Sequence, residues 1–273
     1  MLITTLVFPF IDAGARLARV QYWSRRLLAI VNVELTVSGE LPSDSAHPVL
    51  ILSNHVSWLD IFVINATCPL RFIAKDEIRH WPVIGWLSTR TGSVYIRRTR
   101  RHDARRVNQH LTQAFAAGER FAVFPEGTTT DGTWVMPFHA SLLAPALHAQ
   151  ASLYPAALRF TRSDGSICVE AGYEGDKTLL QSLLGILRQP MIRAQLALLP
   201  PLVTEGKTRR ELAHKAEQII ARTLRLPVAR TKPETPYGPP ASPPTVRAPT
   251  RSPSLSTADP GAAAGPTRPN GRR

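Results

Sequence analysis

The stretch VLILSNHVSWLD, residues 49–60, joins a continuous apolar run to a histidine and an aspartate that stand five residues apart. The apolar run predicts a buried strand over Val49–Leu52, and the apolar residues from Trp58 to Ile64 predict a helix that begins soon after it. Functional sites in α/β folds gather where strands end and helices begin. We therefore expect His55 and Asp60 to leave one strand together.

This pair has the chemistry needed to activate an alcohol. An imidazole titrates near neutral pH and can take a proton from a hydroxyl, while a nearby carboxylate fixes its tautomer and supports the imidazolium that forms. The alternative is an ordinary loop histidine, with Asp60 as a helix-start acid that the helix dipole favours. The pair alone does not decide between the two interpretations.

Three further motifs follow the pair in order: GSVYIRR at residues 92–98, FPEGT at 124–128 and LYPAAL at 153–158. Together with the His-x4-Asp block, they resemble the four ordered blocks of the glycerolipid acyltransferase family, whose bacterial members acylate lysophosphatidic acid. The resemblance covers about residues 49–158 and continues more weakly to about residue 226. It implies transfer of a fatty acyl group from acyl-coenzyme A or acyl carrier protein to the free hydroxyl of a lysophospholipid. The first expectation for this acceptor is 1-acyl-sn-glycerol-3-phosphate, which would give phosphatidic acid.

In such a reaction His55 would be the general base and Asp60 would hold its imidazole. The hydroxyl would attack the thioester directly, so no Ser or Cys nucleophile is required. Consistent with this, the sequence has no Gly-x-Ser-x-Gly elbow of a serine hydrolase. We expect no metal and no cofactor, with acyl-CoA or the acyl carrier protein acting as co-substrate.

The resemblance also implies a set of substrate-binding residues. They are Asn54, Gly92, Arg97, Pro125, Glu126, Gly127, Thr128 and Pro155. Arg97 would contact the acceptor phosphate, since guanidinium groups pair well with phosphate oxygens, although an arginine-rich run is more usually a solvated face. Glu126 would help to bind the acceptor. The alternative for FPEGT is a polar turn after a strand.

The remaining members of the set have shaping roles. Gly92 would allow close backbone approach, and Gly127 with Thr128 would form the turn beside His55. Pro155 would shape the pocket of the acyl donor.

The chain departs from a common form of the family at two places. Thr129 stands where the third block often continues with an arginine, and His139 stands where a lysine is frequent. Two cations that would grip a phosphate are missing, so a lyso-ornithine lipid or another lysolipid stays open as the acceptor. An acyl thioesterase and an inactive, basic membrane-binding protein stay open as other functions.

Composition separates a C-terminal tail from the rest of the 273 residues. Residues 227–273 hold 12 of the 24 prolines and almost no large apolar side chains. Such a segment cannot bury enough surface to offset its ordering entropy, so we predict disorder there. With seven basic and two acidic residues in the tail, a formal charge of +8 out of +13 remains on the other residues.

A basic chain binds nucleic acid, anionic membranes or anionic small molecules. We expect no nucleic acid, because the sequence has no helix-turn-helix, zinc-ligand set or aromatic RNA-binding strand. The partners we expect are the acyl carrier, the lysophospholipid and an anionic membrane surface. Cys68 and Cys168 lie far apart without metal-ligand spacing, which indicates reduced thiols. The expected location is the cytoplasmic face of the inner cell membrane.

The N-terminal residues mix apolar, aromatic and arginine side chains. The apolar run of residues 1–11 ends at Asp12, before the roughly 18 residues that a membrane span requires, and no charged n-region of a signal peptide precedes it. Helices in a membrane interface suit this mixture, with a helical hairpin packed on the domain as the alternative. We predict interfacial helices over residues 1–34, an acyltransferase domain over 35–226 and a disordered tail over 227–273.

Alternating strand and helix patterns predict an α/β fold with a mixed central sheet flanked by helices. Strand patterns occur at Leu35–Val37, Val49–Leu52, Arg71–Ala74, Ser93–Ile96, Phe121–Phe124, Ala156–Phe160 and Ile167–Glu170. Helical periods cover about residues 104–115 and 208–224, the second with a capping box of Thr208 and Glu211. The apolar residues 179–199 have no clear period and fit either a membrane-facing helix or part of the core.

Overall fold

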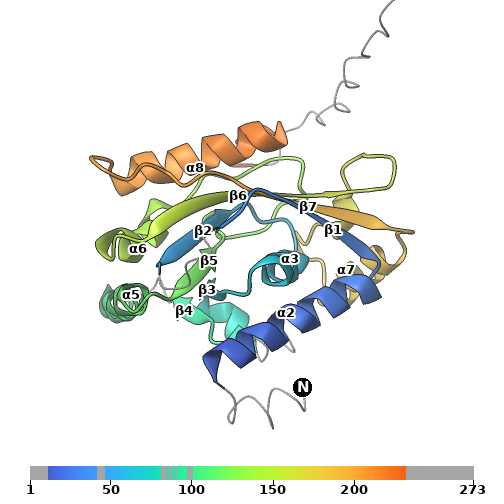
Figure 1. Cartoon of the computed structure of the whole chain (residues 1–273). Coiled ribbons are helices and arrows are strands. Elements are labelled where there is room, and N and C mark those ends of the chain that lie inside the picture. Colours follow the sequence, from blue (N-terminus) through green and yellow to red (C-terminus); the bar gives the residue numbers. More distant parts are fainter. Residues whose placement is uncertain are drawn as a thin grey trace, which may run out of the picture. The chain divides into compact units, whose positions relative to one another are not determined.

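A seven-stranded sheet with helices on both faces forms the centre of the molecule (Figure 1). The structure is a computed structural model, and it describes residues 12–41, 47–80, 85, 88–89, 91–96 and 101–231. These residues belong to one compact unit, residues 1–237. The elements are α2 (Ala13–Ile30), β1 (Val33–Ser38), β2 (Val49–Ser53), α3 (Leu59–Thr67), β3 (Arg71–Lys75), η2 (Asp76–His80), β4 (Val94–Ile96), α5 (Arg101–Ala116), β5 (Arg120–Val123), η3 (Ala140–Leu143), α6 (Ala144–His148), β6 (Ser152–Thr161), η4 (Val169–Ala171), α7 (Leu179–Leu187), β7 (Ile192–Leu198) and α8 (Arg209–Leu224).

The strands lie in the order β1-β7-β6-β2-β5-β3-β4. Neighbouring strands are parallel except for β6 and β7, which are antiparallel. All five residues of β2 are buried, which explains why the central strand is a continuous apolar run instead of an alternating one. The mixed sheet and the α/β fold class are therefore confirmed.

Each face of the sheet carries its own hydrophobic cluster. One cluster joins β2 and β6 to residues of α2, α3 and α7. The other joins β2, β5 and β6 to residues of α5, α6 and α8. Figure 1 shows α8 on one side of the sheet and α2, α3 and α7 on the other, so the fold is a three-layer α/β/α sandwich.

The helices begin where the local chemistry favours a start. Asp12 caps α2 by accepting the N–H of Ala15 at 2.8 Å. The capping box predicted for α8 is confirmed, because Thr208 and Glu211 each bond the other's backbone N–H. Among the described residues, no helix has the length and apolar character needed to cross a membrane.

The sequence patterns failed in two regions. The strand predicted at Ile167–Glu170 is wrong: Ile167 makes one isolated bridge to Thr161, and the chain then turns into η4. This turn brings Tyr173 to the loop after β2, where its N–H donates to Val56 O at 2.8 Å. Residues 179–199 contain both a helix, α7, and a strand, β7, that the missing period did not separate.

The predicted domain boundaries stay predictions. Residues 1–11 of the N-terminal segment and residues 232–273 of the predicted tail lie outside the described residues.

Candidate active site

His55 and Asp60 lie side by side where β2 ends and α3 begins. The imidazole Nδ1 is 2.7 Å from Asp60 Oδ2, and the two side chains are 15% and 0% exposed. The same carboxylate oxygen accepts the backbone N–H groups of Val56 at 2.7 Å and Ser57 at 3.0 Å. Asp60 also stands in the first turn of α3, where the helix dipole favours a negative charge. The buried carboxylate of Asp60 therefore holds Nδ1 of His55, while the imidazole ring stays partly exposed to solvent.

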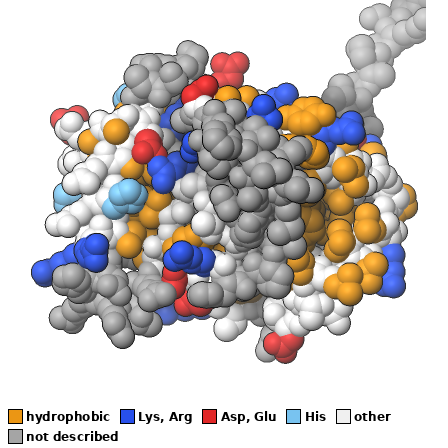
Figure 2. Space-filling view, turned by 90° about the horizontal axis from the view of Figure 1, so that it is seen from below, with side chains coloured by type: hydrophobic (Ala, Val, Ile, Leu, Met, Phe, Trp, Pro, Cys, Tyr) orange, Lys and Arg blue, Asp and Glu red, His pale blue; other side chains and the backbone are white. Residues whose placement is uncertain are grey.

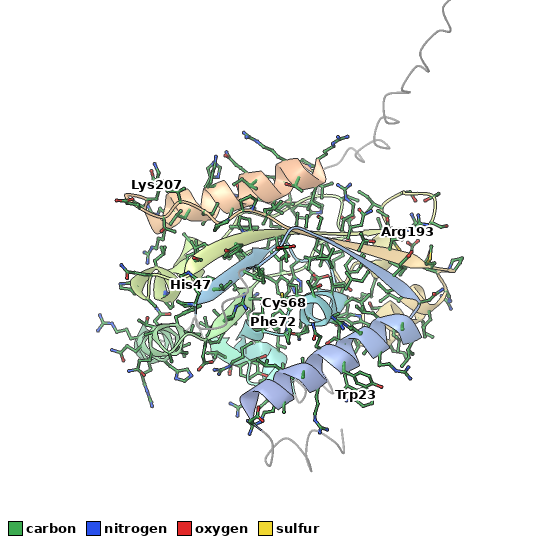
Figure 3. All side chains as sticks on the ribbon, in the orientation of Figure 1. Trp23, His47, Cys68, Phe72, Arg193 and Lys207 are labelled. Atoms are coloured by element: carbon green, nitrogen blue, oxygen red, sulfur yellow. The ribbon has the colours of Figure 1, made fainter. Side chains whose placement is uncertain are left out.

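An aromatic stack fixes the plane of the imidazole. The rings of His55 and Phe124 are parallel within 6°, with centroids 3.9 Å apart, and Phe72 stacks on Phe124 at 5.8 Å. Figure 3 shows Phe72 inside the body of the protein, where it is 4% exposed. Sequence reasoning placed Phe124 only at the end of a strand, and nothing in the sequence signalled the stack.

Glu126 holds the backbone on both sides of the site. Its Oε1 accepts the N–H of His55 at 2.6 Å, and its Oε2 accepts the N–H of Met136 at 2.7 Å. The side chain is 2% exposed. Burial raises the pKa of Glu126 to about 8, while the two N–H donors act in the opposite direction. Both carboxylate oxygens are therefore engaged by this chain's own backbone.

Asn54 ties β2 to β6 through its side chain. Its Nδ2 donates to Leu158 O at 2.9 Å, and its Oδ1 accepts Leu158 N–H at 2.8 Å. The residue is buried. Its amide is thus occupied by the neighbouring strand, directly before His55.

The turn that follows β5 closes over the site. Gly127 has a φ of +74° and donates its N–H to Phe124 O at 3.1 Å, a conformation that favours glycine. Thr130 N–H donates to His55 O at 3.0 Å, so this turn holds the histidine backbone from the side opposite to Glu126. Pro125 is buried and Thr128 is exposed. The turn that the family resemblance placed beside His55 thus contacts the backbone of His55 through Glu126 and Thr130.

The structure does not bring every predicted residue to His55. Gly92 precedes β4 near the start of β3, where its carbonyl accepts Arg71 Nε at 2.7 Å. Because these strands run parallel to β2, Gly92 lies at the opposite end of the sheet from His55. Pro155 is buried within β6, paired with Leu52 of β2. Arg97 lies outside the described residues.

Thr129, at the position of the family's arginine, is held by another segment of the chain. Its hydroxyl donates to the carbonyl of Tyr173. His139 is exposed, and its backbone N–H donates to Pro125 O at 2.9 Å. The contacts of Tyr173 with Thr129 and Val56 were not predicted from the sequence, because they are made by its backbone and no sequence pattern indicates them.

No group of three or more His, Cys, Asp or Glu residues able to hold a metal ion occurs within the described ranges.

Comparison with known proteins identifies the family of this chain. An acyltransferase family model matches residues 34–159, which include His55, Asp60 and Glu126. The lyso-ornithine lipid O-acyltransferase of Pseudomonas aeruginosa is 40% identical over 204 residues, covering 75% of this chain and 77% of that protein. The chain belongs to the acyltransferase family.

Other relatives of the acyltransferase carry a different acceptor in their names. The 1-acyl-sn-glycerol-3-phosphate acyltransferase of Neisseria meningitidis is 37% identical over 151 residues, 55% of this chain and 58% of that protein. The crystal structure of the 1-acyl-sn-glycerophosphate acyltransferase PlsC from Thermotoga maritima matches with a TM-score of 0.63 at 20% identity, covering 82% of this chain and 86% of that one. At this identity the match shows a shared fold alone, and the family resemblance seen in the sequence is confirmed by the relative of Pseudomonas aeruginosa.

Proposed function

We propose that this acyltransferase moves a fatty acyl group from acyl-CoA or acyl carrier protein to the free hydroxyl of a lysolipid. The observation that carries the proposal is the contact of His55 Nδ1 with Asp60 Oδ2 at 2.7 Å, in a loop fixed by Glu126 and Thr130. We place the reaction at the cytoplasmic membrane surface, because both acyl carriers are cytoplasmic and lysolipids are membrane components.

The mechanism follows from which imidazole nitrogen is engaged. With Nδ1–H donated to Asp60, Nε2 has the lone pair that takes the proton of the acceptor hydroxyl. The hydroxyl oxygen attacks the thioester carbonyl carbon, the new C–O bond forms, and collapse of the tetrahedral intermediate breaks the C–S bond. The proton held on Nε2 then passes to the departing sulfur, giving an ester and a free thiol. This sequence of steps uses no metal and no covalent enzyme intermediate.

A lyso-ornithine lipid is the acceptor that we favour. Thr129 supplies no cation where the family often has an arginine, and its hydroxyl is bonded to Tyr173 O. An ornithine headgroup carries a carboxylate and an amine instead of a phosphate, so it does not need that arginine. Relatives named for this activity also include the protein of Rhodobacter capsulatus, 34% identical over 72% of this chain.

Lysophosphatidic acid is the second candidate. The relative from Neisseria meningitidis supports it, and a phosphate would then depend on Arg97 or on other cations of this basic chain.

The test is to incubate the purified full-length protein with labelled acyl-CoA and a panel of lysolipids and to identify the products by mass. We expect a diacylated ornithine lipid as the main product, and more phosphatidic acid than ornithine lipid would reverse the order of the two candidates.

The variant His55→Ala should lose at least 10³-fold in rate, on the order expected when a general base is removed. The matched control is His110→Ala, which removes an exposed histidine of α5. A folded His55→Ala variant with near-normal transfer would refute the mechanism.

A thioesterase would give a different result in the same assay. It would hydrolyse acyl-CoA at a rate that added lysolipid leaves unchanged, and no acylated lipid would form.

A further inference from the structure

Helix α7 exposes a ridge of leucines to solvent. Leu180, Leu184 and Leu187 are 65%, 43% and 50% exposed, and their spacing places them along one side of the helix. The opposite side packs on the protein through buried Ser182 and Ile186. The sequence of α7, LLQSLLGIL, contains no charged residue. A soluble protein rarely leaves so apolar a helix surface uncovered, which indicates a binding partner.

The ridge continues onto α2. The ends of the two helices meet where Asn32 Nδ2 donates to the carbonyl of Pro190 and Ile192 N–H donates to Asn32 O at 3.1 Å. Helix α2 exposes Tyr22, Trp23 and Ile30. Figure 2 shows hydrophobic side chains gathered on the side of this face where Figure 1 has α7 and the end of α2. Figure 3 shows Trp23 pointing from α2 away from the body of the protein.

The cations beside this apolar surface outnumber the acidic residues there, which are Asp12 at the start of α2 and Glu174 and Asp176 before α7. The sequence of α2 contains four arginines and no acidic residue, and those arginines are exposed. Lys177 directly precedes the cap of α7, and exposed Arg188 directly follows the helix. Leucines between cations, next to tyrosine and tryptophan, match the layers of a bilayer surface, where acyl chains lie below anionic headgroups.

We propose that α7 enters the surface of an anionic lipid bilayer beside α2, with Leu180, Leu184 and Leu187 among the acyl chains. The inference deepens the proposed function, because it identifies how a lipid acceptor meets the site. Trp58 Nε1 donates to Ser182 Oγ at 3.0 Å, so α7 is bonded to the loop that holds His55 and Asp60. Tyr173, which precedes α7, donates its N–H to Val56 O at 2.8 Å in the same loop. A membrane-bound α7 would therefore fix the distance between the bilayer surface and the loop that holds His55 and Asp60.

The first experiment measures binding of the full-length protein to vesicles of phosphatidylcholine and phosphatidylglycerol by flotation. We expect the variant carrying Leu180→Gln, Leu184→Gln and Leu187→Gln to bind at least tenfold more weakly than the wild type. Two single variants place the same polar side chain inside and outside the ridge. Leu184→Gln should weaken vesicle binding. Val203→Gln, at a more exposed residue outside the ridge, should leave vesicle binding unchanged. Equal binding of the triple variant and the wild type would overturn the proposal.

A second experiment locates the ridge directly. A nitrobenzoxadiazole label on Leu184→Cys should shift to the blue on vesicle binding and be quenched by lipids with a spin label in the acyl chain, whereas a label on Val203→Cys should not. Burial raises the pKa of the native Cys68 and Cys168 thiols, so they should react poorly with the reagent, which labelling of the wild type checks. Vesicle binding without acyl-chain quenching at residue 184 would show that α7 stays outside the bilayer. If the emission of the label shifts to the blue without vesicles, and the shift grows with protein concentration, the ridge of α7 binds a second copy of the protein and the proposal is refuted.

The two proposals fail in different ways. If no lysolipid is acylated but the label at residue 184 is quenched in vesicles, the proposed function fails and the membrane contact stands. If the triple glutamine variant acylates lysolipids at the wild-type rate both in mixed detergent micelles and in vesicles, the proposed membrane contact is refuted and the proposed function is supported. When both proposals hold, the triple variant keeps its rate in micelles and loses at least tenfold in vesicles.

Discussion

Glu126 determines the local geometry of the site while its own atoms are fully engaged. Each carboxylate oxygen accepts a backbone N–H, one from His55 and one from Met136. The family resemblance predicted a contact with the acceptor, whereas these bonds support a positioning residue that acts through the backbone of His55. The two roles differ in which kinetic constant they affect.

We predict that Glu126→Gln lowers kcat and leaves the KM of the acceptor nearly unchanged. A glutamine offers one acceptor oxygen for two N–H donors, and the buried donor left unpaired costs about 1–3 kcal/mol of stability. Steady-state kinetics and urea denaturation measure both effects. A tenfold rise in KM at constant kcat would instead place Glu126 in contact with the acceptor.

The same residue predicts a pH dependence of stability. Burial raises the pKa of Glu126 in the folded protein to about 8, from an ordinary value of 4.5. The folded state therefore binds a proton that the unfolded state releases, and this stabilising contribution is complete below pH 4.5 and lost as the pH rises to about 8. The free energy of unfolding of the wild type should fall relative to that of Glu126→Gln between pH 5 and pH 8. A constant difference across urea titrations at pH 5, 6.5 and 8 would contradict the raised pKa.

Thr129 gives a test of acceptor choice at a single residue. We predict that Thr129→Arg raises the rate with lysophosphatidic acid relative to lyso-ornithine lipid by about tenfold, since a guanidinium restores a phosphate contact of roughly 1.4 kcal/mol. The control is Thr128→Arg, at the adjacent exposed residue. Competition assays with both acceptors in one reaction measure the ratio, and an equal change in both variants would point to net charge as the cause.

At the scale of elements, one side chain extends the junction between β2 and β6 beyond the last paired residues, Ser53 and Ala156. Asn54→Ala would leave both the N–H and the C=O of Leu158 without their present partners. Each unsatisfied buried group costs about 1–3 kcal/mol, so we expect a loss of about 2–5 kcal/mol in the free energy of unfolding. We also expect a lower kcat, because His55 follows Asn54 directly. Thermal and urea unfolding measure the first effect, with Asn108→Ala on α5 as the control, and a loss no larger than in that control would show that the junction does not need the amide.

The elements also show what sequence patterns can and cannot predict. The central strand, the start of α3 and the capping box of α8 were predictable, because each is fixed by residues close together in the chain. The stack of His55 on Phe124, the clamp of Asn54 on Leu158 and the bond of Thr129 to Tyr173 were not. They join residues that are brought together only by the order of the strands, and the sequence patterns carry no information on that order.

At the scale of the whole molecule, net charge should govern the first contact with a membrane. The formal charge of +8 outside the tail would attract anionic lipids, and such an attraction is screened over about 10 Å at 0.1 M salt. We predict that binding to anionic vesicles weakens at least tenfold between 0.05 M and 0.5 M salt, while binding to neutral vesicles changes little. Flotation across a salt series measures both. The triple glutamine variant of α7 should keep the same salt dependence at lower affinity, because its charges are unchanged.

Two segments about 40 residues apart meet beside the loop that holds His55. Thr129 donates its hydroxyl to Tyr173 O, and a Cβ on Gly172 would lie 2.8 Å from Asp131 Cα. Residues 129–131 therefore pack closely against residues 172–173. Replacing residues 129–131 alone with those of a relative would leave mismatched surfaces, whereas replacing both segments together would keep their contacts. Protein engineers who wish to redirect this enzyme should exchange them as a pair.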